Sequence, residues 1–261
     1  MTLTDQQRKF YENTLAVTRQ EMGAFLYWWR LYSALVFGHD AKQDRFEPLA
    51  DEELGIRPLT TASGHPLSVG VELPGRTVRL KVWEVVVGRT RLLLLDARDG
   101  ANEPTDVDLT GRLYGGDLRM RIEQEMVLGV GGYRALRAAG FHPSVLHLNE
   151  GHSAFALLER AADLVEHQGY SAERAFHEVS ASGVFTTHTP VAAGHDYFPV
   201  DLASEHLAPL AKRLELPMEQ LLALGQQELM DSGDFCPTVL ALRLTQKANG
   251  VSALHGRVSR R

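Results

Sequence analysis

The pattern of hydrophobic and polar positions changes along the chain, and each change marks a different kind of element. Three segments in the first half, 68–73, 77–87 and 90–95, alternate or run apolar with Val, Leu and Trp, and short turn sequences separate them. Alternation with a period of two residues predicts strands, and tight turns between successive strands predict an antiparallel β-meander. This part of the chain is therefore expected to form a small sheet.

A different pattern fills residues 144–198. The runs 145–148 and 184–187 are short, apolar and rich in branched side chains, which is typical of strands buried in a parallel sheet. Between them, apolar residues recur every three or four positions, which predicts a helix that begins near Ser153 and a second helix over 171–179. Strand, helices and strand form a βαβ crossover, and ligands usually bind at the carboxyl ends of such strands.

Helical periodicity accounts for most of the remaining chain. The segment 119–139 predicts a helix that contains Gly129, Gly131 and Gly132, and glycines inside a helix indicate close packing against a neighbour. Further helices are predicted at 201–214, 218–230 and 238–249, and also within 1–40, where an aromatic patch lies at 25–29. We divide the chain into a helical segment 1–40 without assignment and a partial α/β domain at 41–261.

Composition narrows the class of protein. The chain has 261 residues, of which 44% are hydrophobic and 23% charged, as in ordinary soluble domains. A net charge of −6 and the absence of a Lys/Arg block argue against nucleic acid as a partner. The single cysteine, Cys236, excludes an internal disulfide, and no apolar run approaches the roughly 20 residues of a membrane span. We expect a cytoplasmic protein that does not act on a membrane.

Polar side chains follow both strands of the predicted crossover. Asn149, Glu150 and His152 come directly after the first strand, and His188 and His195 follow the second. The carboxyl ends of parallel strands meet at one edge of a sheet, so these side chains are expected to gather there.

The residue types at this edge are compatible with three interpretations. Three imidazoles and a carboxylate are a plausible set of zinc or iron ligands, although neither a short zincin-type spacing nor a cysteine pair is present. Asn, Glu, His and Thr also suit a sugar or phosphate site, where they would hydrogen-bond hydroxyl groups. In the third interpretation the histidines are structural, with His152 near a helix start that Ser153 caps.

Several long strings in the sequence resemble the α-glucan phosphorylase family, that is, glycogen, starch and maltodextrin phosphorylases, and particularly its bacterial branch. The resemblance covers about residues 65–261, whereas residues 1–40 match nothing in the family. The matching strings are Leu113-Tyr-Gly-Gly-Asp117 and the segments 121–132, 147–155, 185–196 and 248–256.

The resemblance implies a fold and an activity. It implies an α/β, Rossmann-like amino-terminal domain of a two-domain glycosyltransferase of the GT-B type. It also implies pyridoxal 5′-phosphate on a lysine of the carboxyl-terminal domain. The implied reaction is the phosphorolysis of α-1,4-glucan by inorganic phosphate, which yields glucose 1-phosphate.

The resemblance also assigns roles to residues. His188 would be the catalytic residue that hydrogen-bonds the glucosyl unit at the cleavage point, beside Thr187. Asn149, Glu150 and His152 would line the sugar pocket or support its loop. A further substrate-binding residue, Asp117, would belong to the loop that gates the pocket. No metal ligand and no cofactor-binding residue is implied in this chain.

The departures from the family pattern lead to a second expectation. The chain stops roughly where the family's first domain ends, no lysine can be assigned to the cofactor, and the glycine-rich loop near the amino terminus is absent. We therefore expect a truncated amino-terminal domain that is inactive alone, cannot bind pyridoxal 5′-phosphate covalently, and pairs with a second copy or with a complementing carboxyl-terminal domain. The alternatives are a non-catalytic glucan-binding or partner-binding remnant and, if His152, His188 and His195 converge, a metal-dependent hydrolase.

Overall fold

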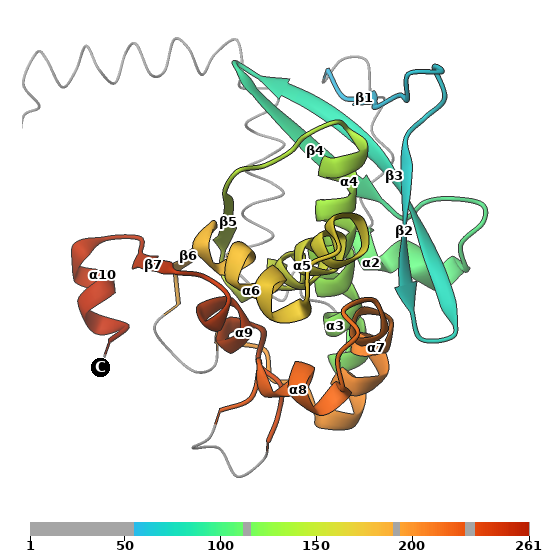
Figure 1. The fold of residues 1–261 in the computed structure, drawn as a ribbon. Helices are drawn as coiled ribbons and strands as arrows, with labels where there is room; N and C mark the ends of the chain where they lie inside the picture. Colours follow the sequence, from blue (N-terminus) through green and yellow to red (C-terminus); the bar gives the residue numbers. More distant parts are fainter. Residues whose placement is uncertain (1–54, 112–115, 190–193, 228–232, 261) are drawn as a thin grey trace, which may run out of the picture.

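The structure, a computed structural model, describes residues 55–111, 116–189, 194–227 and 233–260 and has a mixed α/β fold (Figure 1). The predicted helical segment 1–40, most of the predicted gating loop and residues 190–193 of the matching string 185–196 lie outside these residues. Two sheets organise the described part, one antiparallel and one parallel.

The antiparallel sheet confirms the predicted meander. Strands β2 (Ser68–Leu73), β3 (Arg76–Val87) and β4 (Thr90–Asp96) follow one another, and β3 also pairs with the short β1 (Arg57–Pro58). The turn between β2 and β3 requires Gly75, whose φ of +75° is a left-handed conformation. Alternate side chains of β2 and β3 are buried against the rest of the molecule, as period-two patterning predicts.

One long helical segment lies between this sheet and the rest of the molecule. It consists of α3 (Leu118–Met126), a π turn η2 (Val127–Gly131) and α4 (Gly132–Ala138), and it follows the short helices η1 (Pro104–Val107) and α2 (Asp108–Gly111).

Two glycines allow this segment to approach both of its neighbours. A Cβ on Gly129 would lie 2.8 Å from the backbone nitrogen of Ala156, and one on Gly131 would lie 2.6 Å from Cδ1 of Leu80. The predicted close packing is confirmed at these two positions. It is wrong at Gly132, where a Cβ would meet nothing within 4 Å.

The predicted βαβ crossover is confirmed. Strand β5 (Leu146–Asn149) continues through the 3-10 turn η3 (Gly151–Ser153) into α5 (Phe155–Gln168) and α6 (Ala172–Ala181), and β6 (Gly183–Thr187) then pairs with β5 in parallel. The predicted cap at Ser153 is wrong, because the preceding 3-10 turn runs directly into α5. Ala154 occupies the cap position, and its N–H bonds to the carbonyl of Gly151 at 2.9 Å.

The last part of the chain corrects one prediction. Helices α7 (Val200–Arg213) and α8 (Met218–Ala223) agree with the predicted helices, although α8 ends earlier than expected. The predicted helix 238–249 is wrong: α9 (Pro237–Arg243) ends early, and β7 (Lys247–Gly250) is a third parallel strand beside β6. Backbone pairing with β6 decides the conformation here, because tertiary context overrides a short helical pattern. Helix α10 (Ala253–Val258) follows.

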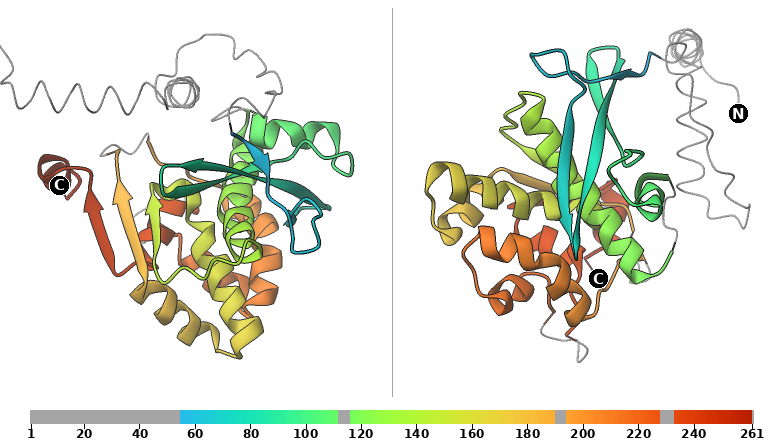
Figure 2. Two further views of the ribbon diagram at one scale, coloured as in Figure 1. Left: turned by 90° about the horizontal axis from the view of Figure 1, so that it is seen from above. Right: turned by 90° about the vertical axis from the view of Figure 1, so that its right-hand side faces the viewer.

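The crossover helices and α9 lie close to the parallel sheet, and Figure 2 shows β5, β6 and β7 side by side. One continuous hydrophobic core joins both sheets and α7, and the rings of Phe155 and Phe235 stack within it at 6.1 Å. None of the described helices is long and apolar enough to cross a membrane.

Candidate functional site

The carboxyl edge of the parallel sheet brings the ends of β5 and β6 together. Asn149 lies opposite Thr186 in the strand register, and Glu150 and His188 follow within two residues. The Glu150 backbone N–H donates to the carbonyl of Thr186 at 3.0 Å, and the Glu150 carboxylate accepts a hydrogen bond from the backbone N–H of His188. The predicted meeting of Glu150 and His188 at this edge is confirmed.

Glu150 has an unusual backbone. Its φ of 68° and ψ of 177° lie in a region that is essentially restricted to glycine and costs about 1–3 kcal/mol for other residues. This conformation turns the chain sharply from β5 into η3, and the Glu150 carboxylate accepts its hydrogen bond from the backbone N–H of His188. A strained residue of this kind persists where the surrounding structure fixes it, and such residues cluster at ligand-binding sites.

A row of polar side chains crosses the parallel sheet below this edge. The Thr186 hydroxyl donates to Oδ1 of Asn249 at 3.0 Å and lies 2.6 Å from Nε2 of His147. A hydroxyl has one proton to donate, so it accepts from His147, and the network assigns the proton of that imidazole to Nε2. The row thus links all three parallel strands.

Of the other predicted site residues, some lie at this edge of the sheet and some do not. The side chains of Asn149 and His188 are exposed, and the Thr187 hydroxyl donates to the carbonyl of Thr189 at 3.4 Å. Asp117 caps α3 by accepting a hydrogen bond from the N–H of Met120 at 3.0 Å. The substrate roles of these residues, and the catalytic role of His188, stay predictions.

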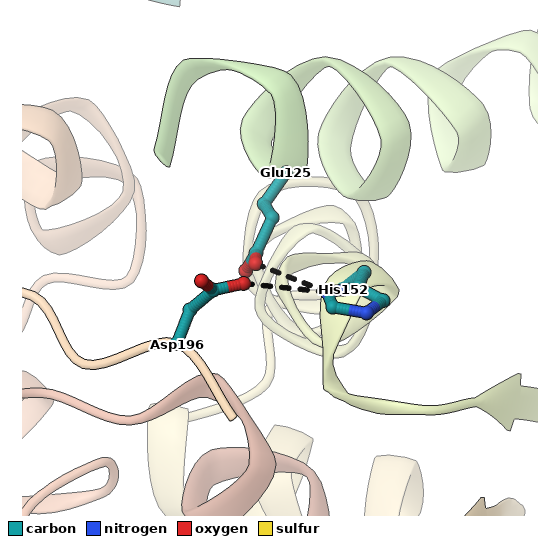
Figure 3. A group of neighbouring side chains, drawn as sticks. All are labelled: Glu125, His152 and Asp196. Carbon is teal, nitrogen blue, oxygen red and sulfur yellow. Dashed lines mark hydrogen bonds and ion pairs between the residues drawn. The ribbon is translucent and has the colours of Figure 1, made fainter. Parts of the chain in front are cut away.

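A cluster of charged side chains around the buried Glu125 includes His152 of the η3 turn. Nδ1 of His152 is 3.3 Å from Oε1 of Glu125 and 3.5 Å from Oδ2 of Asp196 (Figure 3), and Arg121 donates to Oδ2 of Asp196. Figure 3 shows the three side chains reaching one point from the α3 helix, the η3 turn and the segment that precedes α7. His195 instead lies with its Nδ1 3.1 Å from the Thr238 hydroxyl.

Three groups of the cluster, Glu125, His152 and Asp196, have shifted pKa values. The pKa of Glu125 is raised to about 7, chiefly because burial penalises its charged form; His152 opposes this rise and Asp196 adds to it. Burial also opposes the charged form of His152, but hydrogen bonds to Asp196 and Glu125 outweigh burial and raise the pKa of His152 to about 9. Hydrogen bonds from His152, Glu125 and Arg121 hold the pKa of Asp196 well below its usual range despite its burial.

The cluster therefore works as an ion network at neutral pH. The positive charges of His152 and Arg121 balance Asp196 and the partly ionised Glu125. Two carboxylates and an imidazole are chemically able to bind a divalent cation. However, Nδ1 of His152 is the atom shared between the carboxylates, and Arg121 already contacts Asp196. Among the described residues the converging set thus differs from the three histidines that the hydrolase hypothesis required.

Several residues of this region were not singled out from the sequence, among them Glu125, Asp196 and Asn249. Glu125 and Asp196 lie inside two of the strings that carry the family resemblance, but helical periodicity gives no sign that Glu125 turns inward. Asn249 was assigned to a helix, and its place beside Thr186 depends on the unpredicted strand β7. The only sequence signal for all three was their position within matched strings.

The lysines that the structure describes lie elsewhere in the fold than this edge. The described residues include Lys81, Lys212 and Lys247. Lys81 donates to the carbonyl of Arg98 at 2.6 Å in the antiparallel sheet, Lys212 lies in the last turn of α7, and Lys247 pairs with Val184 at the opposite end of the parallel strands. None of these three lysines lies at the carboxyl edge beside Glu150 and His188.

The chain is similar in sequence to several known proteins. No protein-family model matches the chain. The chain is 43% identical over 224 residues to the maltodextrin phosphorylase of Thermococcus litoralis, an alignment that covers 85% of this chain and 26% of that protein. It is 42% identical over 231 residues to the glycogen phosphorylase of Mycobacterium tuberculosis, with 84% and 26% covered. Glycogen phosphorylase of Aquifex aeolicus is 30% identical over 208 residues, with 80% and 30% covered.

The chain thus spans roughly a quarter to a third of the length of these relatives, and most of it is aligned to them. The strings quoted from the sequence, the parallel crossover that they form and the similarity to three phosphorylases agree with one another. By its sequence, the chain belongs to the α-glucan phosphorylase family.

Proposed function

We propose that this chain supplies the amino-terminal, Rossmann-like part of the glucan site of a phosphorylase with GT-B architecture. The complete protein would then convert α-1,4-glucan and inorganic phosphate to glucose 1-phosphate. The relatives named glycogen and maltodextrin phosphorylase support this function. The chain alone is expected to be inactive, because it spans about a quarter of those two relatives and the described lysines lie away from the carboxyl edge.

The observation that carries the proposal is the strained backbone of Glu150. Its side chain fixes the N–H of His188, and the exposed side chains of Asn149 and His188 flank it. Amide, imidazole and carboxylate groups can accept and donate the hydrogen bonds that sugar hydroxyls make. Their fixed placement lowers the entropy lost when a glucosyl unit is oriented.

The test is calorimetric titration of the full 261-residue chain with maltopentaose. Wild type is expected to bind, and His188→Ala is expected to lose most of that affinity. His167→Ala is the matched control, because His167 is exposed on α5 and contacts Asp163, away from the sheet edge. Glu150→Gly should also lose affinity without losing stability, since it removes the carboxylate but relieves the backbone.

Two results would contradict the proposal. One is the absence of maltopentaose binding by wild-type chain that circular dichroism shows to be folded. The other is equal binding by wild type and His188→Ala. In a separate coupled assay, phosphate-dependent release of glucose 1-phosphate by the chain alone would overturn the expectation that it is inactive. Binding without such release, also after addition of a carboxyl-terminal domain from a relative, would favour the non-catalytic glucan-binding alternative.

A further inference from the structure

The side chains behind the proposed sugar site connect three separate parts of the fold. Glu125 and Arg121 belong to α3, His152 belongs to the η3 turn, and Asp196 precedes α7. His152 lies two residues after the strained Glu150, and Asp196 lies eight residues after His188. The cluster therefore joins α3 to the turn that follows β5 and to the segment before α7.

Glu125 occupies the most enclosed place in the cluster. Its side chain is 4% exposed, whereas those of His152 and Asp196 are 24% and 20% exposed. Oε1 of Glu125 lies 3.3 Å from Nδ1 of His152, and a carboxylate oxygen of Glu125 lies within 4.8 Å of one of Asp196. Two neighbouring carboxylates repel each other when both are ionised, whereas a shared proton turns their contact into a hydrogen bond.

We propose that Glu125, His152, Asp196 and Arg121 form an ionic clasp that holds the loop after β5 and the segment before α7 in the geometry needed for glucan binding. Glu125 is the positioning residue of this clasp, and it acts through His152 and Asp196 rather than by touching the sugar. The inference rests on the proposed function, because it assigns the clasp to the same site. Its role is distinct from catalysis.

The protonation of Glu125 gives the clasp a recognisable pH dependence. Glu125 faces His152 from η3, Asp196 from the segment before α7 and, at longer range, the thiol of Cys236 before α9, while Arg121 of its own helix contacts Asp196. As Glu125 loses its proton through a pKa of about 7, repulsion from Asp196 should open the clasp. If only the protonated form binds well, the affinity falls roughly tenfold between pH 6 and pH 8.

The experiment compares Glu125→Gln and Glu125→Ala in the full chain. A glutamine keeps the size of the side chain. It can accept a hydrogen bond from His152 and donate one to Asp196, and it therefore imitates the protonated glutamate. The affinity of wild type for maltopentaose should decline as pH rises from 6 to 8, whereas that of Glu125→Gln should stay nearly constant. At pH 6, Glu125→Ala should bind maltopentaose at least about tenfold more weakly than wild type. Glu205 is an exposed glutamate on α7, and the variant Glu205→Gln serves as the surface control that should bind as wild type does.

A second readout separates the clasp from the proposed function. Nuclear magnetic resonance titration of the His152 ring should show a pKa near 9 in wild type and a lower pKa in Glu125→Ala. An unchanged His152 pKa in folded Glu125→Ala would overturn the clasp. Equal pH dependence of affinity in wild type and Glu125→Gln would overturn the positioning role. Failure of wild type to bind maltopentaose contradicts the proposed function and the positioning role together, while the His152 titration still decides the clasp.

Discussion

Helix α3 carries two buried glutamates, Glu123 and Glu125, that are two residues apart and have opposite electrostatic environments. Oε2 of Glu123 lies 2.8 Å from Arg76, and Oε1 lies 3.5 Å from Nε2 of the fully buried His206. Burial alone would raise the pKa of Glu123, but interactions with His206 and Arg76 outweigh burial and lower it. The pKa of Glu125, beside Asp196, is instead raised.

Helix geometry explains how two such close residues meet different partners. Successive residues are about 100° apart around a helix, so residues two apart point to nearly opposite sides. Glu123 faces the antiparallel sheet through Arg76, which also binds Asp106 at 2.8 Å, and Glu125 faces the loop of the proposed sugar site. Burial opposes the charged form of both glutamates; Arg76 and His206 outweigh it at Glu123, whereas at Glu125 His152 offsets it only in part and Asp196 adds to it.

Removal of the Glu123 carboxylate should have the largest effect on stability. Glu123→Ala leaves the guanidinium of Arg76 with Asp106 alone and His206 without its carboxylate partner. Loss of one partner from a largely buried pair should lower the free energy of unfolding by about 3 kcal/mol. Urea unfolding at pH 7 measures this loss.

The pH dependence of the same variant provides its control. Because the folded-state pKa of Glu123 is lowered, its contribution to stability is present above the unfolded value of 4.5 and is lost as pH falls through the folded value. The difference between wild type and Glu123→Ala should therefore shrink in acid. A difference that stays constant down to pH 3 would show that packing, rather than charge, sets the cost.

The contribution of Glu125 to stability should depend on pH in the opposite direction, and its size should be intermediate. Its folded-state pKa of about 7 lies above the unfolded value of 4.5, so its contribution is fully present below 4.5 and is lost as pH rises through 7. Between pH 5 and pH 7.5, the stability of wild type should fall relative to Glu125→Gln by about 2 kcal/mol. Urea unfolding of both proteins across this window measures it, and parallel curves would mean that Glu125 does not titrate there.

The smallest effect on stability is expected when a charged pair between α3 and α7 is broken at the surface. Arg119 and Glu205 pair at 2.8 Å, with side chains 49% and 46% exposed. Solvent screens such pairs, and many contribute nothing measurable. Glu205→Gln should therefore leave the thermal unfolding midpoint unchanged within error in low and in moderate salt. A clear drop in low salt would show that charges along α3 are coupled over a longer range than their contacts indicate.

The sequence predicted much of the fold and only part of the candidate site, and the helix α3 shows why. Its helical pattern was visible in the spacing of apolar residues, because backbone periodicity is a local property. The partners of Glu123 and Glu125 come from residues 47 positions earlier and 27 and 71 positions later, namely Arg76, His152 and Asp196. Spacing along a helix carries no information about contacts of that kind.

The strand β7 shows the same limit for the backbone. Residues 247–250, Lys-Ala-Asn-Gly, have three exposed residues and little strand propensity. Their extended conformation depends on pairing with β6, which lies about 60 residues earlier in the chain. In contrast, β5 and β6 were predicted within one residue of their observed bounds, because both contain the apolar runs typical of buried strands.

The π turn η2 has a consequence for how this chain should be aligned with distant relatives. It carries an extra residue within an otherwise α-helical segment. The residues before it aim Glu123 and Glu125 at their partners, and those after it place Nε of Arg134 2.8 Å from Oε1 of Glu159. A relative with an uninterrupted α-helix would have one residue fewer in this segment, and an extra residue without the π turn would rotate α4 by about 100° relative to α3. An alignment with such a relative therefore needs a single-residue gap between 126 and 132, because without it every residue of α4 is matched to the wrong face of its counterpart.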